Sequence, residues 1–282
     1  MLLCVEDMRP LPVISIIVIV LILSGAGYAI HSRFLYDSVP SEEVFKNPPI
    51  QGSSPGAVRI PIIIYHRVRP DFPSESEAQR SFSITPQLFE QQLRYLQDQG
   101  YTAISLDEFV RDAELGTTSP AAKPVVLTFD DGWQNQYSYA LPLLEKYHMT
   151  AVFYIYTDPI GKYPEFLTWD EIKTMDAAGM TIGSHTLSHP HLSSLSPAQL
   201  RNELFESKKV LEDHLGKSVV HFASPYGYTS DALVALLKEA GYQTGRTTYK
   251  GAYHSRDDLL HLTGFPVRRD FKDFTWLLQY SQ

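Results

Sequence analysis

The feature that most constrains the fold is a repeated alternation of short apolar runs with helical patterns between residues 60 and 247. Several runs are continuously apolar, which is typical of parallel strands buried on both faces. The alternation predicts an α/β domain with a barrel-like sheet whose chemistry lies at the carboxyl ends of its strands. The predicted strands are Ile60–Tyr65, Tyr101–Ile104, Val125–Phe129, Ala151–Tyr156, Met180–Gly183, His221–Ala223 and Tyr242–Thr247.

Helices are predicted between these strands. Four of them are followed by glycine, which accepts the left-handed conformation that ends a helix, and two begin with a capping residue and a proline, as in Thr85-Pro86 and Ser196-Pro197. The aromatic stretch from Phe271 to Gln282 is interpreted as a final helix that closes the barrel. The other predicted helices are Pro86–Gln99, Leu106–Leu115, Tyr137–His148, Trp169–Ala178, Pro197–Leu215 and Ser230–Ala240.

An almost wholly apolar run extends from Leu11 to Ile30, close to the ~20 residues that span a bilayer. It indicates a membrane anchor or an export signal. The segment Gly27-Tyr28-Ala29 resembles a signal-peptidase site, whereas the acidic Glu6 and Asp7 argue against the positive leader expected of a signal peptide. An uncleaved anchor is slightly favoured.

The domain organisation follows from this run and from the polar stretch behind it. Residues 31–58 are rich in Ser, Pro and Gly, which disfavours regular structure and indicates a flexible tether. We expect an anchor or signal peptide at 1–30, this tether, and a catalytic domain at 59–282. The protein is then membrane-anchored and faces the exterior or periplasm, or is secreted if the leader is cleaved.

Charge and cysteine content exclude several classes of function. The formal net charge is −8 with no block of Lys or Arg, which argues against a nucleic-acid surface. The acidity is a solubility feature or an adaptation to a cationic glycan. The only cysteine, Cys4, precedes the apolar run, so the body has no intrachain disulfide, thiolate metal site or cysteine nucleophile.

Two adjacent carboxylates, Asp130 and Asp131, directly follow the buried strand Val125–Phe129. One can bind a metal while the other takes a proton, and Gly132 permits the tight turn that aims them. A solvated strand-to-helix turn is the alternative.

Three imidazoles, those of His185, His189 and His191, follow the strand Met180–Gly183. The four-residue spacing of His185 and His189 lets both meet one ion if the segment forms a helical turn; His191 is a supporting residue or merely adjacent. Together with Asp131, His185 and His189 would form a three-ligand metal site with open positions. Such a site is typical of a catalytic zinc or similar divalent metal. Such a metal activates water, and Asp130 is placed to act as the general base.

The leaving amine needs a proton donor. His66 closes the first predicted strand, and His261 is the competing residue. The turn formed by Ser224, Pro225, Tyr226 and Gly227 would present the backbone N–H of Tyr226 to a developing oxyanion, unless it is an ordinary turn.

Three segments in order, Thr128-Phe129-Asp130-Asp131-Gly132, His185-Thr186-Leu187-Ser188-His189-Pro190 and Ser224-Pro225-Tyr226-Gly227, resemble the successive motifs of the NodB-type polysaccharide deacetylases. The resemblance extends from about Ile60 to Val267. It implies a distorted (β/α)7 barrel, Asp130 as base, a metal held by Asp131, His185 and His189, and Tyr226 in the oxyanion site.

Within that family, Tyr65-His66-Arg67-Val68 is similar to the branch that acts on poly-β-1,6-N-acetylglucosamine, where the early histidine is the acid. Typical members instead place the acid in a Leu-x-His motif, which Leu259-Leu260-His261 could mimic. The arginine that many members carry before the Pro-Tyr-Gly turn is missing, so Arg67, Arg246 or Arg268 must replace it.

The resemblance implies a hydrolase that removes N-acetyl groups from an amino-sugar polysaccharide of the cell envelope or of a biofilm. Poly-β-1,6-N-acetylglucosamine is the favoured substrate; chitin, peptidoglycan and xylan are alternatives, as is a metal-dependent amidase acting on a small molecule. The metal is zinc, with cobalt, nickel and manganese also compatible with the ligands. A non-catalytic glycan-binding protein is the alternative of another class. Trp133 and Trp169 would line a sugar groove or pack in the core.

Overall fold

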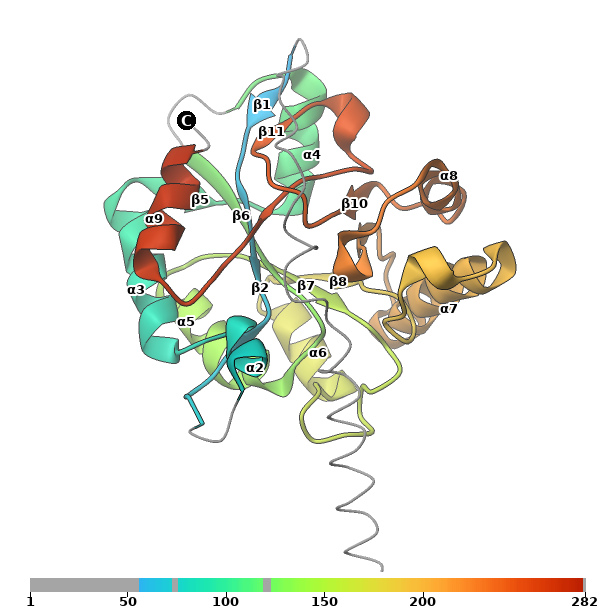
Figure 1. Ribbon diagram of the computed structural model, residues 1–282, viewed down its shortest axis with the longest axis horizontal. Helices are drawn as coiled ribbons and strands as arrows, with labels where there is room; N and C mark the ends of the chain where they lie inside the picture. The colour runs from blue at the N-terminus through green and yellow to red at the C-terminus, as the bar shows by residue number, and fades with distance from the viewer. Residues whose placement is uncertain (1–55, 73–75, 119–122, 281–282) are drawn as a thin grey trace, which may run out of the picture. The chain divides into compact units, whose positions relative to one another are not determined.

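The computed structural model describes residues 56–72, 76–118 and 123–280 (Figure 1). The predicted leader at 1–30 and the tether up to residue 55 lie outside the described residues. Among the described helices, none is both long and apolar enough to cross a bilayer.

A curled sheet of eight strands forms the centre of the described domain, and every neighbouring pair in it is parallel. The strand order is β10-β9-β8-β7-β6-β2-β12, and β5 pairs with β6 beside this path. All seven predicted strands are therefore confirmed. Their bounds are β2 (Ile62–Tyr65), β5 (Tyr101–Ala103), β6 (Lys123–Phe129), β7 (Val152–Ile155), β8 (Thr181–Ser184), β9 (His221–Ala223) and β10 (Thr244–Arg246), and the eighth strand is β12 (Phe265–Pro266).

The segment 259–266 lies at both edges of this sheet, because it contacts the edge strand β10 and contains the other edge strand, β12. Leu262 forms an isolated bridge with Arg246 of β10, and the N–H of Leu262 donates to the carbonyl of Gly245 at 2.8 Å. A few residues later, Phe265 of β12 pairs with Ile63 of β2. The sheet is therefore curled far enough for one short segment to reach both of its edges, as a barrel requires.

Both faces of the sheet are buried. Along each strand successive side chains point to opposite faces, so Ile63, Leu127 and Phe153 belong to one apolar cluster, whereas their neighbours Ile62 and Val126 belong to another. The continuous apolar runs in the sequence have this physical cause. The larger cluster packs against the surrounding helices, which lie outside the strands in Figure 1.

The predicted helices agree with the structure except at one place, and the short helix α2 was not predicted. The predicted helix Tyr137–His148 is a π-helical segment, η2 (Gln136–Ala140), followed by a short α5 (Leu141–Lys146). The aromatic carboxyl-terminal stretch forms a helix that packs on α3 through Tyr95. The helices are α2 (Glu77–Ser81), α3 (Pro86–Asp98), α4 (Leu106–Leu115), α6 (Trp169–Ala177), α7 (Pro197–Leu215), α8 (Asp231–Glu239) and α9 (Phe271–Tyr280).

Several short elements were not predicted. Pro61 separates β2 from a two-residue strand, so the predicted strand Ile60–Tyr65 starts at Ile62. The remaining elements are β1 (Val58–Arg59) paired with β11 (Tyr253–His254), β3 (Arg67–Val68) paired with β4 (Ser83–Ile84), and the 3-10 turns η3 (Leu192–Ser194), η4 (Pro225–Gly227) and η5 (Arg256–Asp258).

His254 in β11 predicts a loss of stability in acid. Its ring packs edge-on against Phe109, and burial lowers the pKa of His254 to about 4. A histidine in the unfolded chain has a pKa near 6.5, so this stabilisation is complete above about pH 6.5 and is lost as the pH falls toward 4. We expect this histidine alone to lower the free energy of unfolding by about 2 kcal/mol between pH 7 and pH 5.

Urea unfolding followed by tryptophan fluorescence at both pH values measures this loss. A His254→Leu variant should show about 2 kcal/mol less pH dependence than the wild type. An unchanged pH dependence in the variant would show that His254 is not held neutral in the folded protein.

Candidate metal and acid-base site

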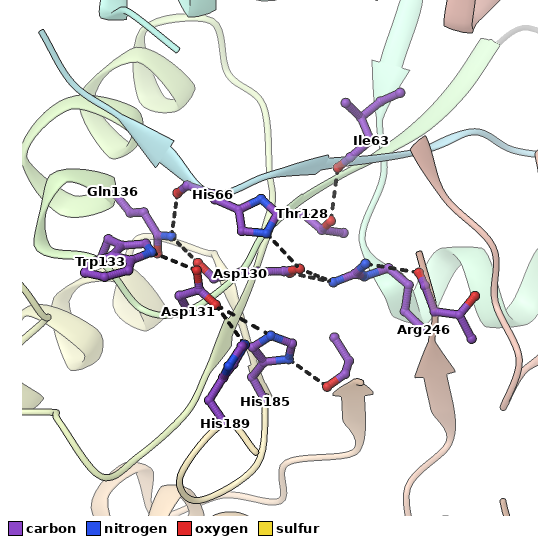
Figure 2. A network of polar contacts seen from close by, with 12 residues as sticks. Ile63, His66, Thr128, Asp130, Asp131, Trp133, Gln136, His185, His189 and Arg246 are labelled. Atoms are coloured by element: carbon purple, nitrogen blue, oxygen red, sulfur yellow. Dashed lines mark hydrogen bonds and ion pairs between the residues drawn. The ribbon is translucent and has the colours of Figure 1, made fainter. Parts of the chain in front are cut away.

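The polar residues singled out in the sequence meet at the carboxyl edge of the curled sheet (Figure 2). His66 follows β2, Asp130 and Asp131 follow β6, His185 follows β8, and Arg246 ends β10. Because all of these strands are parallel, their carboxyl ends lie at one edge, and the curl of the sheet turns the side chains toward one another.

Asp131, His185 and His189 place one ligand atom each within 4.8 Å of the others. The Oδ1 atom of Asp131 lies 3.6 Å from His185 Nε2 and 3.4 Å from His189 Nε2. Ligand atoms bound about 2.1 Å from one tetrahedral ion are about 3.4 Å apart, so the observed separations fit a single divalent metal. Two imidazoles and a carboxylate are also a donor set that zinc and related metals accept.

The ring of His185 is oriented for ligation. Its Nδ1 atom lies 2.7 Å from the carbonyl oxygen of Ala223, which assigns the proton to Nδ1 and the lone pair to Nε2. Burial lowers the pKa of His185 to about 4, so the imidazole is neutral near pH 7. A neutral imidazole with a free Nε2 lone pair is the form that binds a metal.

The second oxygen of Asp131 is held by Trp133, whose indole Nε1 donates to Oδ2 at 2.8 Å. The Trp133 ring stacks on Phe166 with ring centroids 4.4 Å apart, and the guanidinium carbon of Arg67 lies 3.6 Å from the centroid of the Trp133 ring. Burial acts to raise the pKa of Asp131, but the hydrogen bond from His189 and the neighbouring histidine charges hold it well below its usual range. Trp133 thus supports the carboxylate form of Asp131.

Residues 185–189 do not form the helical turn that was given as the condition for both imidazoles to meet one ion. Thr186 and His189 both have left-handed backbone angles, with φ of 74° and 58°, and the N–H of His189 donates to Thr186 Oγ1 at 3.0 Å. A bent loop of residues 186–189, called the 186–189 loop, therefore brings His189 beside His185. The four-residue spacing was the right signal, but a different backbone shape produces the contact.

Asp130 is buried and forms an ion pair with Arg246. The Arg246 Nη2 atom lies 2.5 Å from Oδ1 and 2.6 Å from Oδ2, and Nη1 donates to the carbonyl of Thr247 at 3.1 Å. Arg246, one of the three cations considered in the sequence, lies beside Asp130, and Arg67 stacks on Trp133. The arginine missing before the Pro-Tyr-Gly turn is thus replaced from another strand.

His66 lies closer to the carboxylates than the competing His261 does. His66 Nε2 is 3.9 Å from Asp130 Oδ2. His261 pairs through Nδ1 with Thr229 Oγ1 at 3.0 Å, and among the described residues it forms no ion pair with Asp130. The geometry therefore favours His66 as the proton donor, and the role itself stays a prediction.

Gln136 was not singled out in the sequence. Its Nε2 atom donates to the backbone carbonyls of His66 at 2.8 Å and of Asp130 at 2.6 Å, so it ties the ends of β2 and β6 together. The local sequence contains no signal for this role, because an amide directly before a predicted helix is ordinarily interpreted as a surface residue.

The turn η4 places Pro225 and Tyr226 next to the ligands. Tyr226 has a left-handed φ of 56°, and its ring stacks on His191 at 3.9 Å and meets His189 at 4.9 Å. His191 is thus in contact with the turn and is exposed. The oxyanion role of Pro225 and Tyr226 stays a prediction.

Comparison with known proteins identifies the family. The sequence model described as polysaccharide deacetylase matches residues 117–245. The chain is 31% identical over 202 residues to YxkH of Bacillus subtilis (strain 168), assigned as a polysaccharide deacetylase, with 71% of this chain and 67% of YxkH covered. The chain belongs to the polysaccharide deacetylases. The resemblance drawn from the three motifs and the prediction of a hydrolase are confirmed.

Other polysaccharide deacetylases support the same assignment. The poly-beta-1,6-N-acetyl-D-glucosamine N-deacetylase of Staphylococcus aureus (strain MRSA252) is 29% identical over 202 residues, which cover 64% of this chain and 69% of that protein. The solved structure of the Streptococcus pyogenes deacetylase PplD in complex with acetate has a TM-score of 0.73 and 30% identity, and covers 80% of this chain and 99% of that one. The α/β fold with a curled parallel sheet is thereby confirmed.

A Trp133→Phe variant of this deacetylase is expected to bind zinc about tenfold more weakly, because the phenyl ring keeps the stack on Phe166 but leaves Asp131 Oδ2 without its donor. Competition with a coloured chelator measures the affinity. Trp169→Phe is the matched control, since Trp169 stacks on His214. Equal affinities for the two variants would contradict a supporting role for Trp133.

Proposed function

We propose that this chain is a divalent-metal-dependent deacetylase that hydrolyses N-acetyl groups of an amino-sugar polymer, with zinc as its metal. The observation that carries the proposal is the placement of Asp131, His185 and His189 around one point, directly beside the buried Asp130–Arg246 pair. This arrangement combines a metal-ligand set with a separate, charged base.

In the proposed reaction the bound metal supplies Lewis-acid polarisation of the amide carbonyl and a lowered pKa for water. Asp130 accepts a proton from the attacking water, and Arg246 donates to both carboxylate oxygens of Asp130. His66 donates a proton to the leaving amine nitrogen, and the backbone N–H of Tyr226 supports the negative charge that develops on the acyl oxygen. The products are acetate and a free amino sugar.

The proposed substrate is poly-β-1,6-N-acetylglucosamine. Its support is the similarity to the S. aureus enzyme named for that polymer and the position of His66 beside Asp130. Chitin, peptidoglycan and xylan are the competing substrates. Their deacetylases also remove acetyl groups, and they differ in the groove residues that contact the polymer.

We also propose that the apolar run 11–30 holds the enzyme at a membrane, facing the exterior or periplasm, with secretion as the alternative if the leader is cleaved. The length of the run supports this proposal. A distorted (β/α)7 barrel is the proposed architecture of the domain, supported by the segment 259–266, which contacts β10 at one edge of the sheet and forms β12 at the other.

The test is acetate release by the full chain, purified in mild detergent, from oligomers of poly-β-1,6-N-acetylglucosamine and of chitin. Release from the first polymer that requires an added divalent metal after chelation would support the proposal. Faster release from chitin oligomers would indicate that chitin is the substrate. Failure to release acetate from either polymer, with metal bound, would contradict the proposed activity.

A further inference from the structure

The two histidine ligands are positioned by different means. His185 directly follows β8, and its ring is held by the carbonyl of Ala223. His189 lies at the end of the 186–189 loop, so its position depends on the shape of that loop. Thr186 is β-branched and has a φ of 74°, a conformation that persists only where the surroundings impose it.

The buried carboxylate of Glu203, on helix α7, holds the middle of this loop. Its Oε2 atom accepts the backbone N–H groups of Leu187 and Ser188, each at 2.9 Å, and its Oε1 atom accepts the hydroxyl of Ser188 at 2.6 Å. Hydrogen bonds to an ionised acceptor are stronger than neutral ones, and three of them compensate the burial of this charge.

Helix α7 is a rigid base for this contact. It is 19 residues long, begins with a capping box at Ser196 and ends at Gly216 in the left-handed conformation. The same helix holds the end of β8, because the hydroxyls of Ser207 and Ser184 lie 2.8 Å apart. One helix thus sets both the strand that precedes His185 and the loop that carries His189.

We propose that Glu203 is a positioning residue that shapes the 186–189 loop for metal binding without touching the metal. This inference rests on the proposed metal-dependent function. The loop is also held to residues 157 and 158, where the N–H of Asp158 donates to the carbonyl of Leu187 at 2.8 Å. Loss of Glu203 should therefore loosen the loop without unfolding the domain.

The test is cobalt affinity of the full, metal-stripped chain, measured by visible absorption and by chelator competition. We expect Glu203→Ala to weaken cobalt binding about 10- to 100-fold, since outer supports of metal ligands have effects of this size. Glu203→Gln retains one acceptor oxygen and the shape of the side chain, so its affinity should lie between the wild type and Glu203→Ala. Glu206→Ala, an exposed change on the same helix, is the matched control and should bind within about twofold of the wild type.

Cobalt affinity of Glu203→Ala equal to that of the Glu206→Ala control would overturn the inference, whatever the change in thermal stability. If Glu203→Ala does not fold, the cobalt affinities of Glu203→Gln and Ser188→Ala test the inference. Cobalt affinity equal to that of the wild type in both variants would overturn it. A wild-type chain that binds no cobalt would contradict the proposed function instead, so the two failures are distinguishable.

Discussion

An Asp130→Asn variant is expected to release acetate about a thousandfold more slowly than the wild type while it binds metal with nearly unchanged affinity. The amide has the shape of the carboxylate, and its oxygen can still accept from Arg246, but it cannot take a proton from water. In the proposed site the carboxylate that binds the metal is that of the neighbouring Asp131, so this substitution would leave the three proposed ligands intact. Acetate release and chelator competition measure the two quantities.

Asp131→Asn is the matched control for this prediction, because it changes the adjacent carboxylate in the same way. We expect it to weaken metal binding, whereas Asp130→Asn should not. Acetate release by Asp130→Asn within about tenfold of the wild type would show that Asp130 is not the general base.

Replacing Arg246 with methionine should lower both stability and activity. Arg246 is fully buried and pairs with both oxygens of Asp130, and removing one partner of a buried pair leaves an uncompensated charge, which costs about 3 to 5 kcal/mol. Without its partner the carboxylate also loses its orientation, so we expect acetate release to fall about a hundredfold. Urea unfolding and acetate release measure the two effects.

A double variant separates these effects. Combining Arg246→Met with Asp130→Asn removes both charges, so stability should recover relative to Arg246→Met alone while activity stays low. Arg246→Lys keeps the charge without the planar fork and should fall between the wild type and Arg246→Met in both measurements. If the loss of unfolding free energy in the double variant equals the sum of the losses in the two single variants, a direct pair between Arg246 and Asp130 would be contradicted.

Much of the fold was predictable because its signals are local. Several of the central strands, such as Ile62–Tyr65 and Val152–Ile155, are continuously apolar. Two of the helices, Leu106–Leu115 and Pro197–Leu215, have the predicted bounds because their caps are encoded next to them. The strand β12 has only two residues, which is too short for an alternating pattern to be detected. The π-helical segment η2 departs from the usual helical period, so the search for that period does not reveal it.

The meeting of Asp131, His185 and His189 was predictable for a similar reason. Asp131 and His185 stand just after buried strands, and His189 follows His185 by four residues. The parallel arrangement of those strands carries their ends to one edge of the sheet. The prediction needed only the order of strands and the chemistry of the side chains. The backbone shape of the 186–189 loop was not needed, and only the structure shows that this loop is bent and not a helical turn.

The tertiary structure decided which residues support these groups, because the sequence left three arginines open as the partner of Asp130 and did not mark Glu203. Arg246 is 116 residues from Asp130, and Glu203 reaches Ser188 from a helix whose surface pattern does not mark it. Such contacts depend on strand register, on the curl of the sheet and on the rotation of each helix. These are set by the packing of the whole core, so the sequence by itself determined which groups do the proposed chemistry, and the tertiary structure decided which groups hold them.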